Sequence, residues 1–244
     1  MTTPPYAELV AFVRSEGEAI VSASRQGVDA PVPTCGDWTV ADLCRHVGRV
    51  YGRVAHIVSE RLTTESGYWP EVTGDPVDWV AETLDDLVAA LGGCDPDTPV
   101  WNWSASSQIA SFWARRMAHE SAVHRFDAQR AHGVAQPVDA DLARDGLDEM
   151  VDLLLPRMVV RDGLTPADAT YAFESIEAGA PGGWRVRTGA GAVARADADA
   201  VPDVVVRGTA SALLLAAYNR VPWTSLEVTG DSGALDAWSE TFRF

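Results

Sequence analysis

The sequence predicts an α+β protein of two domains, a helical half over residues 1–134 and a smaller α+β half over residues 135–244. Apolar residues recur with a helical period through the first half. The second half instead contains short β-rich or alternating runs separated by Gly, Pro and Asp. With 244 residues, the chain is long enough for one large or two small domains with a sizeable core.

Four helices are expected in the N-terminal half because apolar residues recur there every three to four positions. Their ends carry local signals. Thr39 and Asp42 have the spacing of a capping box, Pro76 is suited to the first helical position, and Gly133 to a helix end. The expected helices span residues 4–26, 40–61, 76–91 and 108–132.

The C-terminal half is expected to begin with one more helix and then to alternate strands with helices. Its boundary lies near residues 134–139, where the character of the sequence changes. Gly-rich turns are expected at residues 179–183 and 189–191. The expected helices span residues 139–160, 209–218 and 231–242, and the expected strands span residues 169–176, 183–188, 201–207 and 226–229.

A polar stripe runs along the fourth predicted helix. Glu120 and His124 are four residues apart, about 40° of helix rotation, so both side chains leave the same face and one cation could contact both. Arg116 precedes Glu120 by one turn, and Asp127 follows His124 by three residues. The alternatives are a solvated charged face or an internal Glu–His hydrogen bond.

His119 resembles part of a zinc-protease motif but has the wrong spacing. His119 and Glu120 followed by His124 contain one residue too many for HExxH. The two histidines are five apart, about 140° around a helix, so they cannot share a metal ion. A metal at this helix would therefore use Glu120, His124 and a residue from another helix.

His46 is a candidate for that third residue. It lies on the flank of the apolar stripe of the second predicted helix. A histidine beside the apolar seam of a bundle is either a hydrogen-bonded core residue or a ligand, and its position alone leaves both open. Polar residues that face the interior of four helices are a common setting for metal sites.

Composition excludes several classes of function. The formal net charge of −16 argues against nucleic acid or an anionic membrane as a partner, and no apolar run is long enough to span a membrane. The absence of lysine excludes Schiff-base and P-loop lysine chemistry. Three cysteines without a CxxC pair, and no recognisable secretory signal, predict a cytoplasmic protein.

The chain resembles the mycothiol-dependent maleylpyruvate isomerase family, within the wider DinB-like metalloprotein group. The resemblance rests on CGDWTVADLCRHV (Cys35–Val47), MAHESAVHRFDAQRAHG (Met117–Gly133), and the weaker tail pattern LLLAAYNR followed by LEVTGDSGALDAW. It implies a DinB-like four-helix bundle followed by a sterol-carrier-like α+β domain. The segments occur in the order that the family has.

The resemblance also implies a metal ion, usually Zn²⁺, held by His46, Glu120 and His124. Three protein ligands leave a fourth position for water, thiol or substrate, and histidine with carboxylate suits Zn²⁺ or another divalent ion. Asp127 would not bind the ion itself but would contact a ligand or pack between helices. The thiol implied is mycothiol, a low-molecular-weight cosubstrate.

Four further residues are candidates for the site, and the resemblance supports only the first of them. Arg220 matches an arginine of the family's second domain and would act in catalysis on a carboxylated substrate, for which guanidinium is a suitable partner. Arg49 and Arg53, one and two turns beyond His46, are expected to face the cavity and bind the cofactor. Trp101, in a loop with a second tryptophan, is expected to line the same cavity and to bind the cofactor as well, because loops with paired aromatic residues often line sites. Ordinary surface positions are the alternative for all three arginines.

The resulting prediction is an isomerase or S-transferase that adds a metal-activated thiolate to an electrophilic, carboxylated small molecule. Two alternatives remain: a non-catalytic small-molecule or lipid-binding protein with a structural metal, and a metal-dependent hydrolase with bound water as nucleophile. Thiol dependence separates the first from the others. The expected assembly is a monomer or a homodimer.

Overall fold

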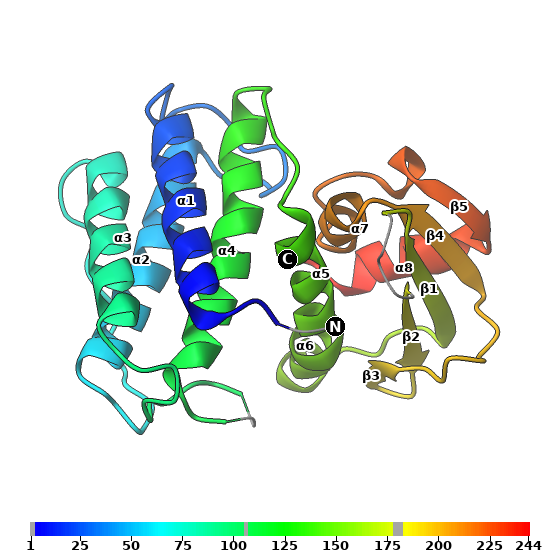
Figure 1. Cartoon of the computed structure of the whole chain (residues 1–244). Coiled ribbons are helices and arrows are strands. Elements are labelled where there is room, and N and C mark those ends of the chain that lie inside the picture. Colours follow the sequence, from blue (N-terminus) through cyan, green and yellow to red (C-terminus); the bar gives the residue numbers. More distant parts are fainter. Residues whose placement is uncertain (1–2, 105–106, 178–182) are drawn as a thin grey trace. The chain divides into compact units, whose positions relative to one another are not determined.

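The chain forms two compact units, residues 4–136 and residues 137–244 (Figure 1). The structure is a computed structural model that describes residues 3–104, 107–177 and 183–244. The first unit is helical and the second contains a sheet, so the predicted α+β class is confirmed. The turn expected at residues 179–183 lies outside the described residues, except for Gly183, which begins a strand.

The first unit consists of the four expected helices, whose ends differ only slightly from the predicted ones. Helix α1 packs mainly on α4, and α2 packs mainly on α3. At the start of α2, the Thr39 side chain accepts a hydrogen bond from the Asp42 backbone, and the Asp42 carboxylate accepts one from the Thr39 backbone at 3.0 Å. The helices are α1 (Tyr6–Ser24), α2 (Val40–Ser59), α3 (Pro76–Gly92) and α4 (Ala110–Ala131).

Gly48 allows α2 to approach α3 closely. A Cβ atom at this position would lie 2.6 Å from Cζ3 of Trp79, nearer than two such atoms can approach. The packing of this face against α3 leaves the flank that carries His46 free to face α4. The apolar stripe of α2 therefore determines which helix His46 meets.

The second unit is built on a five-stranded mixed sheet with the strand order β3-β2-β1-β4-β5. Strand β1 pairs antiparallel with β2 and parallel with β4, and the two outer pairs are antiparallel. The strands are β1 (Ala169–Ser175), β2 (Gly183–Gly189), β3 (Ala192–Arg195), β4 (Val204–Gly208) and β5 (Glu227–Gly230). The helices are α5 (Ala140–Glu149), η1 (Met150–Leu154), α6 (Leu155–Asp162), α7 (Ala210–Ala217), η2 (Trp223–Ser225) and α8 (Ser232–Thr241).

Strand β3 was not among the predicted elements. The turn expected at residues 189–191 is the tip of a hairpin that joins β2 to β3, with positive φ angles of 49° at Ala190 and 71° at Gly191. Two such residues in succession match the twist of antiparallel strands. The strand is four residues long and buries only Val193, so its sequence carries little β-signal.

The prediction of one continuous helix over residues 139–160 is wrong, because the helix is interrupted. A π-helical turn, Met150–Leu154, separates α5 from α6. Pro156 explains the break, because a proline inside a helix has no N–H to donate and its ring clashes with the preceding turn. A wider turn just before the proline accommodates the ring.

No helix in the described part of the chain is both long and apolar enough to cross a membrane.

Candidate metal centre

Three side chains of the first unit come together between two helices. His46 projects from α2, and Glu120 and His124 project from α4. Oε1 of Glu120 lies 3.3 Å from Nε2 of His46 and 3.3 Å from Nε2 of His124. The three ligand atoms all lie within 4.8 Å of one another, so a single ion could contact all of them.

The carboxylate of Glu120 is oriented by Arg116. Nη2 of Arg116 donates to Oε2 of Glu120 at 3.0 Å, which leaves Oε1 for the two histidines. Burial acts to raise the pKa of Glu120, but hydrogen bonds from His124 and His46 and the nearby charges outweigh burial and hold this pKa well below its usual value. Glu120 is therefore present as a carboxylate, the form that binds metal ions.

His124 is held from its other side by Asp127. Nδ1 of His124 donates to Oδ2 of Asp127 at 3.0 Å, and the Asp127 side chain is fully buried. Burial acts to lower the pKa of His124, but hydrogen bonds with Asp127 and Glu120 outweigh burial and raise this pKa to about 9. In the metal-free protein, the ring therefore carries both protons at neutral pH, with Nδ1–H directed at Asp127 and Nε2–H at Glu120. A bound metal ion would replace the Nε2 proton, while Asp127 keeps the Nδ1 proton.

The spacing of these atoms fits a tetrahedral divalent ion. Two ligand atoms that each lie about 2.05 Å from such an ion are about 3.3 Å apart, the separation found for both histidine–carboxylate pairs. Two imidazoles and one carboxylate are a suitable donor set for Zn²⁺. The residues present therefore fit the metal that the sequence resemblance implies.

A second set of possible ligands shares His124. Cys35, His124 and Asp127 also place their ligand atoms within 4.8 Å of one another, but on the Nδ1 side of the ring. Asp127 has no exposed side-chain surface, whereas the His46 and Glu120 side chains are 38% and 19% exposed. A substrate can therefore reach the first set more readily than the second.

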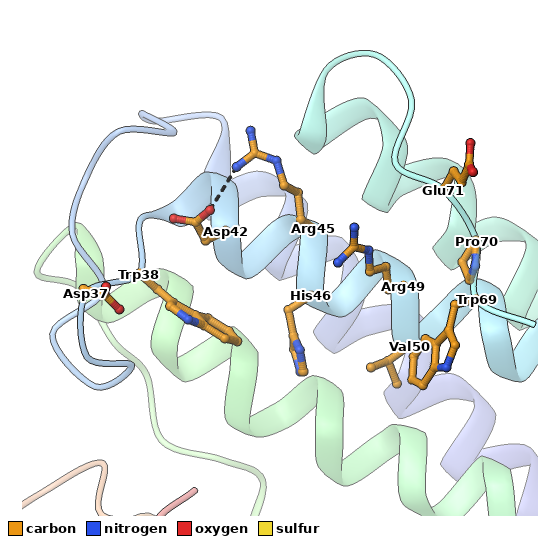
Figure 2. Close-up of a pocket in the computed structure, with 10 residues that line it drawn as sticks. All are labelled: Asp37, Trp38, Asp42, Arg45, His46, Arg49, Val50, Trp69, Pro70 and Glu71. Atoms are coloured by element: carbon orange, nitrogen blue, oxygen red, sulfur yellow. Dashed lines mark hydrogen bonds and ion pairs between the residues drawn. The ribbon is translucent and has the colours of Figure 1, made fainter. Parts of the chain in front are cut away.

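An open pocket of about 800 Å³ lies beside His46 (Figure 2). Its aromatic wall comes from Trp38 and Trp69, and the Trp38 ring lies 5.1 Å from the ring of His46, centroid to centroid. This volume is typical of small-molecule sites. The lining residues are Asp37, Trp38, Asp42, Arg45, His46, Arg49, Val50, Trp69, Pro70 and Glu71.

Two arginines of α2 flank His46 in this pocket and differ in their partners. Nη1 of Arg45 pairs with Oδ1 of Asp42 at 3.0 Å, whereas Arg49 forms no ion pair among the described residues. In Figure 2, Asp37 and Glu71 lie on opposite sides of the row formed by Arg45, His46 and Arg49. Arg49 therefore places a guanidinium without an ion pair among the described residues next to a candidate ligand, in a pocket that also holds the carboxylates of Asp37 and Glu71.

Arg53 and Trp101, both expected at the cavity, are not among the residues that line this pocket. Nη1 of Arg53 donates to the carbonyl of Tyr68 at 2.8 Å, and the guanidinium lies 4.3 Å from the centroid of the Trp69 ring. Arg53 therefore anchors the loop between α2 and α3. Trp101 accepts a hydrogen bond at its carbonyl from Nε1 of Trp113 at 2.7 Å.

Arg220 belongs to the second unit. It is 94% buried there, and Nη1 of its guanidinium donates to the carbonyl of Tyr218 at 2.9 Å and to the carbonyl of Phe244 at 3.1 Å. These bonds connect the end of α7 to the chain terminus. The resemblance alone supports a role for Arg220 in catalysis.

Sequence reasoning missed residues from the loop before α2. Trp38 lies against His46, and Thr34 and Cys35 both donate to Asp127. Cys35 and Trp38 lie in the segment Cys35–Val47 that carries part of the family resemblance, and this segment was the signal that could have found them. His119 belongs to neither set of possible ligands in the described part of the chain.

The comparisons with known proteins identify the family of this chain. A family profile for the mycothiol maleylpyruvate isomerase N-terminal domain matches residues 7–129, and one for the MDMPI C-terminal domain matches residues 141–237. A crystal structure of the mycothiol-dependent maleylpyruvate isomerase matches with a TM-score of 0.65 and 15% identity, over 94% of this chain and 96% of that chain.

A mutant of that isomerase, with one histidine replaced by alanine, matches with a TM-score of 0.63 over the same shares and at the same identity. At this identity, the two crystal structures support the fold alone. No curated protein matches the chain in sequence. Together the two profiles cover both units, and the chain belongs to the mycothiol-dependent maleylpyruvate isomerase family.

Proposed function

We propose that this protein is a Zn²⁺- and mycothiol-dependent isomerase or S-transferase that acts on an electrophilic, carboxylated small molecule. The observation that carries the proposal is the set of three ligand atoms on His46, Glu120 and His124. They lie next to an open pocket in which Arg49 has no ion pair among the described residues. Family membership supports both the reaction class and the thiol.

In this proposal, His46, Glu120 and His124 would hold the ion, and three protein ligands would leave it accessible to an external ligand such as the thiol. Bound Zn²⁺ would supply a Lewis acid that lowers the pKa of the thiol, so that the thiolate is present at neutral pH. Arg116 keeps the Glu120 carboxylate in place, and Asp127 keeps Nε2 of His124 directed toward it. The protein thus holds these side chains in place before the metal ion or the thiol binds.

The thiolate adds to one carbon of a conjugated cis double bond, and the electron pair of that bond moves onto the conjugated carbonyl. The remaining carbon–carbon single bond rotates, the double bond re-forms as trans, and the thiolate leaves unchanged. Arg49 is suited to hold a carboxylate of the substrate during this rotation, because guanidinium binds carboxylates with two hydrogen bonds. In an S-transferase, the sulfur would stay attached.

The test is thiol dependence, with maleylpyruvate as the probe substrate. The Zn²⁺-loaded protein should isomerise maleylpyruvate in the presence of mycothiol and show no turnover without a thiol. Thiol-independent consumption of the probe would contradict the proposal and favour a hydrolase. A protein that binds Zn²⁺ but turns over neither this probe nor other unsaturated acids with mycothiol would favour a binding protein.

Arg49→Ala should raise KM for a carboxylated substrate roughly tenfold while kcat changes less, because a hydrogen bond to a charged group contributes about 1.5–3 kcal/mol. Arg45→Ala is the matched control, since Arg45 lines the same pocket but its charge is paired with Asp42. Steady-state kinetics of both variants provide the measurement. An equal or larger effect at Arg45 would show that Arg49 does not bind the carboxylate.

A further inference from the structure

The fully buried carboxylate of Asp127 contacts the ring of His124 on the side opposite to Glu120. The partners of the Asp127 side chain include Oγ1 of Thr34, which donates to Oδ1 at 2.6 Å, Sγ of Cys35, which donates to Oδ2 at 3.5 Å, and Nδ1 of His124, which donates to Oδ2 at 3.0 Å. Two of these donors come from the loop between α1 and α2. A charge without solvent contact depends on such partners for its stability and its orientation.

The loop that supplies Thr34 and Cys35 is itself firmly held. The Val32 side chain is fully buried, and its backbone N–H donates to the carbonyl of Trp38 at 2.8 Å. The Cys35 N–H donates to the carbonyl of Val32 at 3.0 Å, and Gly36 turns the chain with a φ of 67° that favours glycine. The loop therefore presents the Thr34 hydroxyl at a defined position.

We propose that Thr34 is a positioning residue of the metal centre. Its hydroxyl fixes Oδ1 of Asp127, so that Oδ2 remains on Nδ1 of His124 and Nε2 of His124 remains directed toward Glu120 and His46. The inference rests on the proposed function, because it concerns the affinity of the same three ligands for a metal ion. It adds a residue from a loop that carries none of the ligands.

The Thr34 bond is the stronger of the two that the loop makes. An O–H donor to a carboxylate at 2.6 Å is a short, charge-assisted hydrogen bond. A thiol is a weak donor, and at 3.5 Å Cys35 cannot replace it. Without the Thr34 hydroxyl, Oδ1 would lose this donor, and with no exposed side-chain surface Asp127 has no direct access to bulk water in exchange.

Thr34→Val removes the hydroxyl with little change in shape, and Thr34→Ser restores it. Partners that orient a metal-bound histidine typically change metal affinity by about 10–100-fold when they are removed. We expect the affinity for Zn²⁺ to fall by this factor in Thr34→Val and to change by less than about threefold in Thr34→Ser. Competition with a chromophoric chelator measures both, and Thr73→Val, at an exposed threonine, controls for the loss of a hydroxyl elsewhere.

A second measurement does not need the metal. In ¹⁵N spectra of the metal-free protein, the ring proton on Nδ1 of His124 should be shifted downfield and protected from exchange by Asp127. Thr34→Val should reduce this protection, whereas Thr34→Ser should retain it. If Thr34→Val does not fold, Thr34→Ala carries the same comparison without added apolar bulk.

The two readouts separate the possible failures. Wild-type affinity and unchanged His124 signals in Thr34→Val would overturn the role of Thr34 and leave the metal centre intact. A wild-type protein that takes up no Zn²⁺ would overturn the proposed function, and the His124 spectra would then decide by themselves whether Thr34 positions the ring through Asp127.

Discussion

Replacing His124 by alanine should lower the affinity for Zn²⁺ by more than about 100-fold. Loss of a residue that only hydrogen-bonds a metal ligand lowers metal affinity by up to about 100-fold, and loss of a ligand itself should cost more. In the proposed site, Nε2 of His124 is one of three ligand atoms and lies 3.3 Å from Oε1 of Glu120, so its loss would leave two ligands on two different helices. Metal content after dialysis and competition titration measure the change. Mycothiol-dependent activity should disappear with the metal.

The matched control is His132→Ala. His132 follows the last turn of the same helix and belongs to neither set of possible ligands among the described residues. His124→Ala also removes a donor from buried Asp127, at a cost of about 1–3 kcal/mol of folding free energy, so circular dichroism must first show that the variant is folded. A folded His124→Ala protein that retains one tightly bound Zn²⁺ would contradict the assignment.

Replacing Trp238 by alanine should cost about 3–5 kcal/mol of folding free energy, the range for loss of a buried aromatic ring. Trp238 is 1% exposed, and its ring centroid lies 5.0 Å from those of Tyr171 and Phe242 and 5.4 Å from that of Phe173. Its Nε1 donates to the carbonyl of Ala217 at 3.1 Å. The variant leaves a cavity where α8 packs on the sheet.

Urea unfolding followed by circular dichroism measures this loss, with Trp69→Ala as the control. The Trp69 side chain is 56% exposed, and its described cation–π contact is with the guanidinium of Arg53. Trp69→Ala should therefore lower the free energy of unfolding by less than about 1 kcal/mol. Below the unfolding transition, Trp238→Ala should still bind Zn²⁺, because all three candidate ligands lie in the first unit. Equal costs for the two tryptophans would contradict the described core.

Much of the first unit could be predicted from the sequence because its signals are local. The helical period of apolar residues and the capping residues Thr39 and Asp42 lie within a few positions of the features they determine. The same is true of Glu120 and His124, whose spacing on one helix already places them on one face. In the second unit, β3 was missed because a four-residue strand with one buried residue produces a weak pattern. The break before Pro156 was missed because the apolar period continues through it, although the proline itself marks a break.

By itself, the sequence determined the α+β class, the four helices and the pairing of Glu120 with His124, since each depends on residues close along the chain. Only the tertiary structure decided that His46 meets Glu120 across 74 positions and that Thr34 meets Asp127 across 93. It also placed Arg49 at the pocket while Arg53 anchors a loop. Such contacts depend on how helices and loops pack, and packing brings together residues that no local spacing connects.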